Sequence, residues 1–210
     1  MIEYDNATSG NALGKSTLSW SHTCSGSNRI LLVGVADYST SPSSVTYGGN
    51  NLTLITSIYN STTWWYLINP PTGSKTITIT FSSSENFIAG IAVSYKGVTQ
   101  TNPIDTYATK KIDATSCSVD ISPSTGSMVV DLIFGFADYH NSSGTPGSGQ
   151  TEVLDNYFLR ENGGYEMRFS SYKLNATSMS YSTPETINWK YCAIAIKPVP
   201  ETSNAFLSFF

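Results

Sequence analysis

Two aspartates occupy matching positions in a repeated stretch of the sequence, and a pair of carboxylates can hold a metal ion or transfer protons. Leu31–Pro42 reads LLVGVADYSTSP, and Leu132–Pro146 reads LIFGFADYHNSSGTP. Both stretches carry an apolar run, then Ala-Asp-Tyr, then an exit rich in Ser and Pro. Asp37 and Asp138 could be a catalytic or metal-binding pair. Alternatively, they could mark the same strand end in two related halves of the chain.

The other carboxylates are most densely spaced in EVLDNYFLRENGGYE, which contains Glu152, Asp155, Glu161 and Glu166. A glycosidase needs two carboxylates that face each other across a cleft. Because residues three apart on a strand point to opposite faces, we expect Glu152 and Asp155 to be separated. The histidines, His22 and His140, lie in a predicted strand and a predicted loop, and no nucleophile elbow, P-loop, dinucleotide fingerprint or EF-hand loop occurs. We predict that the protein is not an enzyme and has neither catalytic residues nor a cofactor.

The three cysteines, Cys24, Cys117 and Cys192, have neither the even number of a disulfide framework nor the close spacing of a zinc site. On a strand, His22 and Cys24 would point to one face, and with the other two cysteines they could form a Cys3His site. The interpretation that we favour is that all three are small buried side chains on strands. No metal site is expected, and the sequence leaves the redox state of the cysteines open.

The composition limits the classes of partner. Charged residues make up only 12% of the 210 residues, while Ser, Thr and Asn are abundant, which is typical of extracellular, surface-displayed and virion β-proteins. The net charge is −4 and no run of Lys and Arg occurs, although nucleic-acid binding needs clustered positive charge. No apolar stretch is long enough for a membrane-spanning helix. We therefore expect neither a nucleic acid nor a membrane as partner.

The chain begins with MIEYDNATSG, which contains acidic residues and lacks the apolar core of a secretory signal peptide. A surface-type composition without an export signal suits a virion component, because such a protein leaves the cell inside a particle. We therefore expect synthesis in the host cytoplasm and localisation in the virion. The alternative is an extracellular or cell-surface location.

Most segments show the period-2 or continuous apolar pattern of β-strands, separated by Gly, Pro, Asn and Ser. The stretch KTITITF alternates strictly, with Ile77, Ile79 and Phe81 on one face and threonines on the other, which predicts a half-exposed antiparallel strand. No window shows convincing helical periodicity. The pattern predicts an all-β protein.

Several segments recur in the same order along the chain. SGSNRILLVGVADY aligns with STGSMVVDLIFGFADY, TITITFS with TSMSYS, and IAGIAVSYKGV with YCAIAIKPV, at offsets of about 100 residues. The repeat predicts related halves at about 16–100 and 117–198 within a single domain over about 1–200. Halves with equal strand orders most simply pack face to face, as a jelly-roll-like antiparallel β-sandwich. The alternative is two tandem small β-sandwiches joined around Pro103–Thr115.

The repeat also predicts a core and a position for the two aspartates. Asp37 and Asp138 should lie at equivalent strand ends without sharing a metal ion. We expect one buried core to unite apolar residues from both halves: Leu31, Val33, Val35, Ile91, Val93, Val130, Leu132, Phe134, Ile194 and Ile196.

The strings GSNRILLVGVA, SSVTYGGNNLTLI, WWYLINPPTGSKTITITF and IAGIAVSYKGVTQTNPID give the chain a family resemblance. Over about Thr17–Lys197, the chain resembles a Gly/Ser/Thr-rich β-sandwich domain that recurs in phage structural (virion) proteins and microbial surface proteins. The most specific piece is W-Y-L-x-N-P-P-x-G followed by an alternating strand. The resemblance implies a sandwich fold and a structural or adhesive role, and it implies no catalytic residues.

A cluster of aromatic residues around one turn region could bind a glycan. Tyr47, Tyr59, Trp64 and Trp65 could stack on sugar rings, with Asn and Asp reading the hydroxyl groups. However, alternation in TTWWYLIN sends Trp64 and Trp65 to opposite faces, so one of them must belong to the core. A carbohydrate-binding (lectin-like) module or adhesin is therefore an alternative function.

The segment 201–210 follows two prolines, and it contains Phe206, Leu207, Phe209 and Phe210. Chain ends are usually polar and frayed, so this apolar segment predicts an interface with another subunit. We predict a virion structural protein, and more specifically a capsid decoration or cement protein. Its partners would be the major capsid protein or other virion subunits, and we expect it to be a homo-oligomer. A subunit of an extracellular filament is a further alternative.

Overall fold

The computed structural model describes residues 1–200 except 38–39, 60, 139–140 and 161–162. Strands make up 73% of the structure, and no helix occurs among the described residues. The first half contains β1 (Glu3–Cys24), β2 (Ile30–Ala36), β3 (Ser44–Tyr47), β4 (Asn50–Asn51), β5 (Thr53–Ile58), β6 (Thr62–Ile68) and β7 (Gly73–Lys96). The second half contains β8 (Ile104–Asp120), β9 (Met128–Ala137), β10 (Thr145–Pro146), β11 (Thr151–Leu159), β12 (Tyr165–Leu174) and β13 (Ser178–Ile196).

The two halves share one strand order. The first sheet runs β4-β3-β7-β2-β6-β5, with β1 on β7, and the second runs β10-β13-β9-β12-β11, with β8 on β13. Apart from the two-residue β4, every strand of the first half has a counterpart in the second, and every pairing is antiparallel. The prediction of an all-β, antiparallel sandwich fold with two related halves is confirmed.

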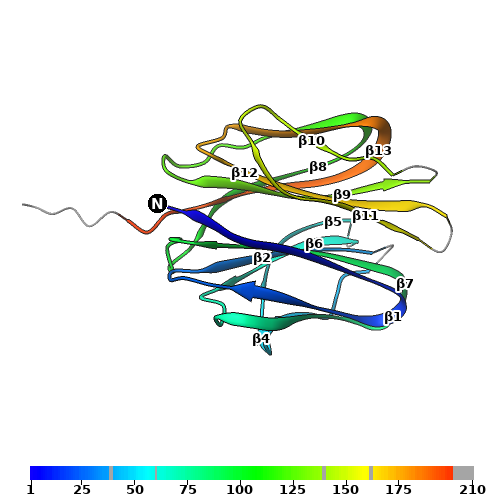
Figure 1. The fold of residues 1–210 in the computed structure, drawn as a ribbon, viewed down its shortest axis with the longest axis horizontal. Helices are drawn as coiled ribbons and strands as arrows, with labels where there is room; N and C mark the ends of the chain where they lie inside the picture. Colours follow the sequence, from blue (N-terminus) through cyan, green and yellow to red (C-terminus); the bar gives the residue numbers. More distant parts are fainter. Residues whose placement is uncertain (38–39, 60, 139–140, 161–162, 201–210) are drawn as a thin grey trace, which may run out of the picture.

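Each half curls into two layers because its longest strand belongs to both. The first part of β7 pairs with β3 at Ile77–Thr80, and its last part pairs with β2 at Ala89–Tyr95. Strand β1 follows β7 through both layers, with a register shift between Lys15 and Thr17. In the second half, β13 pairs first with β10 and then with β9. Figure 1 shows the resulting stack of layers, with the two halves lying one above the other.

Three apolar cores fill the spaces between the layers. One lies within the first half and includes Leu31, Val33 and Val35. A second lies within the second half, around Phe169 and Trp189. The third joins the two halves and contains the residues Ile91, Val93, Val130, Leu132, Phe134, Ile194 and Ile196. Each half is thus a small sandwich, as in the tandem alternative, and the inner layers of the two sandwiches also pack against each other.

The predicted burial of the core residues is confirmed, whereas their placement in one core is wrong. Leu31, Val33 and Val35 point away from the seam, by which we mean the interface between the two halves. The alternate residues Ile30 and Leu32 face the second half. Both faces of β2 are buried, so its apolar residues form a continuous run. Such a run does not show which residues face the core of the first half and which face the core shared by the two halves. Across the seam, the ring of Phe134 lies against the backbone of Gly34, where a Cβ would come within 3.0 Å of Phe134 Cε2.

The two halves begin earlier than the sequence repeat at 16–100 and 117–198 suggested. They span 3–96 and 104–196, joined by 97–103. The junction that the tandem alternative placed at Pro103–Thr115 is wrong, because β8 starts at Ile104. Most side chains of β8 as far as Ser116 are at least partly exposed, so this edge strand lacks the apolar alternation that would reveal it.

Candidate functional site

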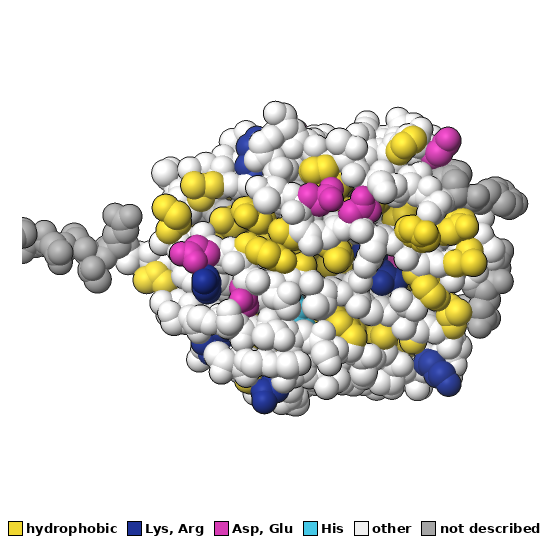
Figure 2. All heavy atoms as spheres, in the orientation of Figure 1, with side chains coloured by type: hydrophobic (Ala, Val, Ile, Leu, Met, Phe, Trp, Pro, Cys, Tyr) yellow, Lys and Arg dark blue, Asp and Glu magenta, His cyan; other side chains and the backbone are white. Residues whose placement is uncertain are grey.

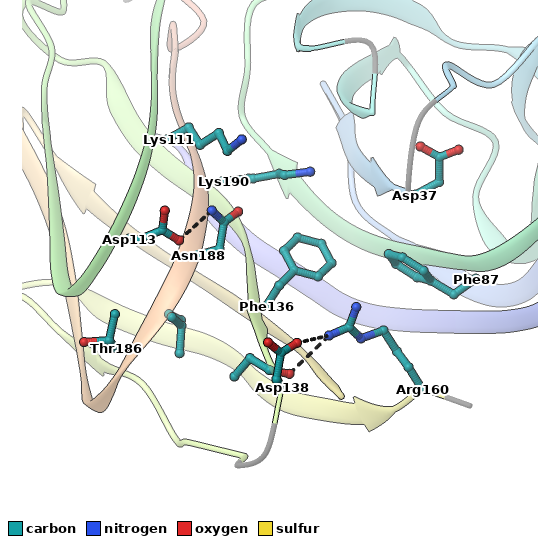
Figure 3. Close-up of a pocket in the computed structure, with 12 residues that line it drawn as sticks. Asp37, Phe87, Lys111, Asp113, Phe136, Asp138, Arg160, Thr186, Asn188 and Lys190 are labelled. Atoms are coloured by element: carbon teal, nitrogen blue, oxygen red, sulfur yellow. Dashed lines mark hydrogen bonds and ion pairs between the residues drawn. The ribbon is translucent and has the colours of Figure 1, made fainter. Parts of the chain in front are cut away.

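A cavity opens where the two sandwiches meet, at the ends of β2 and β9. Its volume is about 520 Å3, and β7, β8 and β13 also line it. Figure 3 shows charged side chains directed into this space from both halves. The cavity is therefore built by the association of the halves, and neither half forms it alone.

Asp37 and Asp138 both line the cavity and lie at equivalent strand ends, one residue after β2 and β9. Their environments differ. Asp37 is buried and accepts a hydrogen bond from the Thr40 hydroxyl at 3.0 Å. The side chain of Asp138 is 81% exposed and lies 3.8 Å from Arg160 Nη2. The predicted equivalence in position is confirmed, but the two carboxylates have different partners.

Arg160 connects the polar and apolar parts of the cavity. Its guanidinium lies 5.8 Å from the ring centres of both Phe87 and Phe136, and Nη2 donates to the Ala137 carbonyl at 3.1 Å. Arginine combines hydrogen bonding at its edge with contact to aromatic faces. These contacts hold the buried guanidinium in one orientation.

Two lysines carry positive charge into the opposite wall. Lys190 Nζ donates to the Ser61 hydroxyl at 3.0 Å and lies 4.9 Å from the Phe136 ring centre. Burial lowers the pKa of Lys190, nearby Lys111 lowers it further, and Asp37 acts in the opposite direction. The ammonium group of Lys111 lies 4.7 Å from the ring centre of Tyr59. The lysine from β13 thus bonds across the seam to the first half.

A carboxylate and an amide complete this wall. Asn188 Nδ2 donates to Asp113 Oδ1 at 2.7 Å. Three cationic and three anionic side chains therefore line one cavity together with aromatic surface. Among the described residues, no group of three His, Cys, Asp or Glu side chains could hold a metal ion. The arrangement can bind a polar ligand.

The predicted aromatic platform for a glycan does not form. Tyr47 and Trp64 are fully buried, and Trp64 Nε1 donates to the Leu132 carbonyl of the other half at 3.1 Å. Trp65 packs against the core of the first half. Trp65 is partly buried, and Tyr59 is 78% exposed. The prediction is wrong because Tyr47 and Trp64 lie inside two different cores and cannot stack on a sugar ring.

Glu152 and Asp155 lie on the same face of β11, so the expectation that they are separated is wrong. A β-bulge shifts the register between Glu152 and Leu154, and Glu152 and Asp155 lie opposite Ser171 and Phe169. The inserted residue reverses the alternation at this point. Burial raises the pKa of Glu152, and the charge of Asp155 raises it further. Glu161 lies outside the described residues.

The cysteines and histidines are dispersed. Cys24, Cys117 and Cys192 are buried, as predicted, each in a different core, and all three are free thiols. His22 is buried, and its ring nitrogens lie 2.8 Å from Thr8 Oγ1 and 3.1 Å from Ser94 Oγ. Burial lowers its pKa to about 4. No Cys3His site forms from these residues, and His140 lies outside the described residues.

The sequence did not predict that three charged residues of the second half are buried: Asp131, Glu166 and Arg168. Asp131 is fully buried and accepts hydrogen bonds from the Ser171 hydroxyl at 2.8 Å and the Tyr191 hydroxyl at 2.9 Å. Glu166 and Arg168 form a buried ion pair at 2.7 Å. Glu166 lies opposite Phe136, so this pair faces the seam. A charged residue inside a continuous apolar run, such as MVVDLIF, is the signal that could have found Asp131.

The predicted interface residues Phe206, Leu207, Phe209 and Phe210 lie outside the described residues. No helix in the described part of the chain is both long and apolar enough to cross a membrane.

Comparisons with known proteins give no family. No family model and no curated protein matches the chain. A solved structure titled "Red Clover Necrotic Mosaic Virus" aligns with 94% of this chain and 82% of its own, at 8% identity and a TM-score of 0.25. A similarity of this size indicates neither a shared fold nor a shared function.

Proposed function

We propose that the protein is a structural component of a virus particle, and more specifically a decoration protein that attaches to the capsid through the apolar segment 205–210. The observation that supports the proposal is the composition of this segment, which contains Phe206, Leu207, Phe209 and Phe210. Among the described residues, the members of all three cores lie between Ile2 and Ile196.

The chain leaves the fold at a fixed point. Val98 and Pro198 form a β-bridge, and Val199 N donates to the Gly97 carbonyl at 3.0 Å. Strands β2 and β9 start at this end of the molecule and finish at the cavity, so the exit lies at the end away from the cavity (Figure 1). Pro198 and Val199 are therefore held next to the junction of the two halves.

The composition of the segment favours burial against a partner. Burying three Phe and one Leu side chain gains about 6–10 kcal/mol. Ordering residues 205–210 costs about 1–2 kcal/mol per residue, which roughly offsets this gain at one contact. A nearly balanced contact of this kind suits attachment that is repeated many times over a particle.

The surface also offers material for contacts between copies. Tyr157 and Leu159 on β11 are 55% and 51% exposed. Figure 2 shows apolar side chains in a band across the middle of the face that carries β1 and β11. Apolar surface of this kind often marks protein–protein contact, which supports homo-oligomer formation within the particle.

The attachment can be tested by replacing Phe206, Leu207, Phe209 and Phe210 together with serine, which keeps the length of the chain. A matched control replaces the polar residues Glu201 and Ser203 with alanine. If the segment docks on the capsid, the quadruple variant should keep the wild-type melting temperature and lose binding to purified capsids in co-sedimentation. A large fall in melting temperature with capsid binding retained would contradict the proposal.

A further inference from the structure

The cavity between the sandwiches alternates hydrogen-bond donors with acceptors along its walls. Lys111 and Asp113 point into it from β8, and Asn188 and Lys190 come from β13 (Figure 3). The amide of Asn188 is tied to Asp113 at 2.7 Å. A ligand that matches these walls must donate and accept hydrogen bonds at neighbouring atoms. Hydroxyl groups do both.

The charges on the walls disfavour ions as ligands. Three carboxylates line the cavity beside three cationic groups. Asp37, Asp113 and Asp138 would repel a phosphate or a carboxylate. Lys111, Lys190 and Arg160 would repel a cation. A neutral ligand avoids both penalties and can still bond to charged partners, and such bonds are the stronger kind.

The apolar part of the cavity fits the carbon-bound hydrogens of a sugar ring. Phe136 is partly exposed and lies between Lys190 and Arg160, and it contacts Phe87 edge to face at 5.8 Å. The volume of about 520 Å3 lies within the usual range for small-molecule sites. Polar walls around an aromatic floor match the two sides of a saccharide.

We propose that this cavity binds a neutral saccharide, with Lys111, Asp113, Asn188 and Lys190 contacting its hydroxyls and Phe136 its ring. The site differs from the aromatic cluster that the sequence suggested. It lies at the end of the molecule away from Pro198, where the last described residues are held, so a particle protein that attaches through the residues that follow would keep it accessible. The inference goes beyond the structural role and does not depend on it.

The test is saturation-transfer NMR with glucose, galactose, mannose, N-acetylglucosamine and N-acetylgalactosamine as neutral probes. N-acetylneuraminic acid and inorganic phosphate serve as charged comparisons. We expect at least one neutral sugar to bind, with neither charged probe competing for it. The variants Lys111→Gln and Asp113→Asn should each weaken its affinity by about tenfold, because each removes a charged hydrogen-bond partner.

Both substitutions lie at exposed positions of β8, so the fold is expected to persist. Unchanged melting temperatures would confirm this. Lys75→Gln and Asp120→Asn, at exposed positions outside the cavity lining, are the matched controls and should leave the affinity unchanged. The proposal is overturned if no neutral sugar binds, if only a charged probe binds, or if Lys111→Gln and Asp113→Asn leave the affinity unaltered.

Discussion

The two halves share a strand order but bury different ionisable groups. The first half buries His22, a neutral imidazole whose pKa burial lowers to about 4. The second half buries Asp131, whose pKa burial raises to about 7. Both groups are held by hydroxyls: His22 by Thr8 of its own strand β1 and Ser94 of β7, and Asp131 by Ser171 of β12 and Tyr191 of β13. The comparison teaches that the strand pattern determines the topology, while each half satisfies its buried polar groups with its own residues.

These two buried groups consequently respond to pH in opposite directions. In the unfolded chain His22 takes up a proton below its ordinary pKa of 6.5, whereas in the folded state it does so only near 4. Its contribution to stability therefore falls as the pH drops between these values. Asp131 holds its proton up to about pH 7 in the folded state, against 3.8 when unfolded. Its contribution falls as the pH rises through this window.

The largest effect is expected at the seam, where the halves depend on each other. Phe134 is fully buried between them. Phe134→Ala should lower the free energy of unfolding by about 3–5 kcal/mol, because it leaves a cavity in the shared core. Urea denaturation measures this. Leu54→Ala, at a position that is 48% exposed, is the control and should change little. A loss below about 1 kcal/mol for Phe134→Ala would show that the seam does not stabilise the fold.

The opposite pH responses can be separated by Asp131→Asn and His22→Asn. Relative to the wild type, Asp131→Asn should shift the pH dependence of the unfolding free energy toward a rise between about pH 4 and 6.5, by a few kcal/mol at most, because it removes the group that is destabilised as the pH rises. His22→Asn should shift it in the opposite direction. Urea titrations at several pH values test both variants. Equal slopes in the two variants would refute the assignment of opposite responses to the halves.

The smallest effect is expected at a clamp that occurs once in each half, in which an aspartate near the start of the first strand accepts hydrogen bonds from the loop after that strand. Asp5 accepts hydrogen bonds from Ser25 N and from the Ser94 hydroxyl, both at 2.8 Å. Asp105, near the start of β8, accepts them from Ser124 N at 2.5 Å and the Ser124 hydroxyl at 3.0 Å. These bonds hold the loop after the first strand of each half.

Asp5→Ala and Asp105→Ala should each lower the free energy of unfolding by about 1–2 kcal/mol, and the two losses should be similar. Thermal melts of the two variants, with Asp120→Ala as an exposed control, are the check. A loss at one site only would mean that the clamps are not equivalent.

The sequence predicted elements wherever burial follows the strand period. Ile77, Ile79 and Phe81 are buried on one face of β7, as the alternation in KTITITF indicated. The sequence did not predict that KTITITF and IAGIAV belong to one strand, because the bend between them is created by packing across the layers. Most of β8 was missed because its exposed edge residues carry no apolar pattern.

The candidate site was predictable only in part. The repeated Ala-Asp-Tyr placed Asp37 and Asp138 at equivalent strand ends, and both line the cavity. The cationic residues of the cavity come from separate places in the chain: Lys111 lies on β8, Arg160 follows β11, and Lys190 lies on β13. No local spacing in the sequence links them. Their convergence follows from how the two halves pack.

The most direct test of the central claim is quantitative mass spectrometry of virus particles that are purified by density gradient from cells producing the protein. If the protein is a structural component, it should co-purify at a fixed ratio to the major capsid protein. The variant with four serines in place of Phe206, Leu207, Phe209 and Phe210 should fold and be lost from the particles. Absence of the wild-type protein from intact particles, or its presence only in variable traces, would contradict the account.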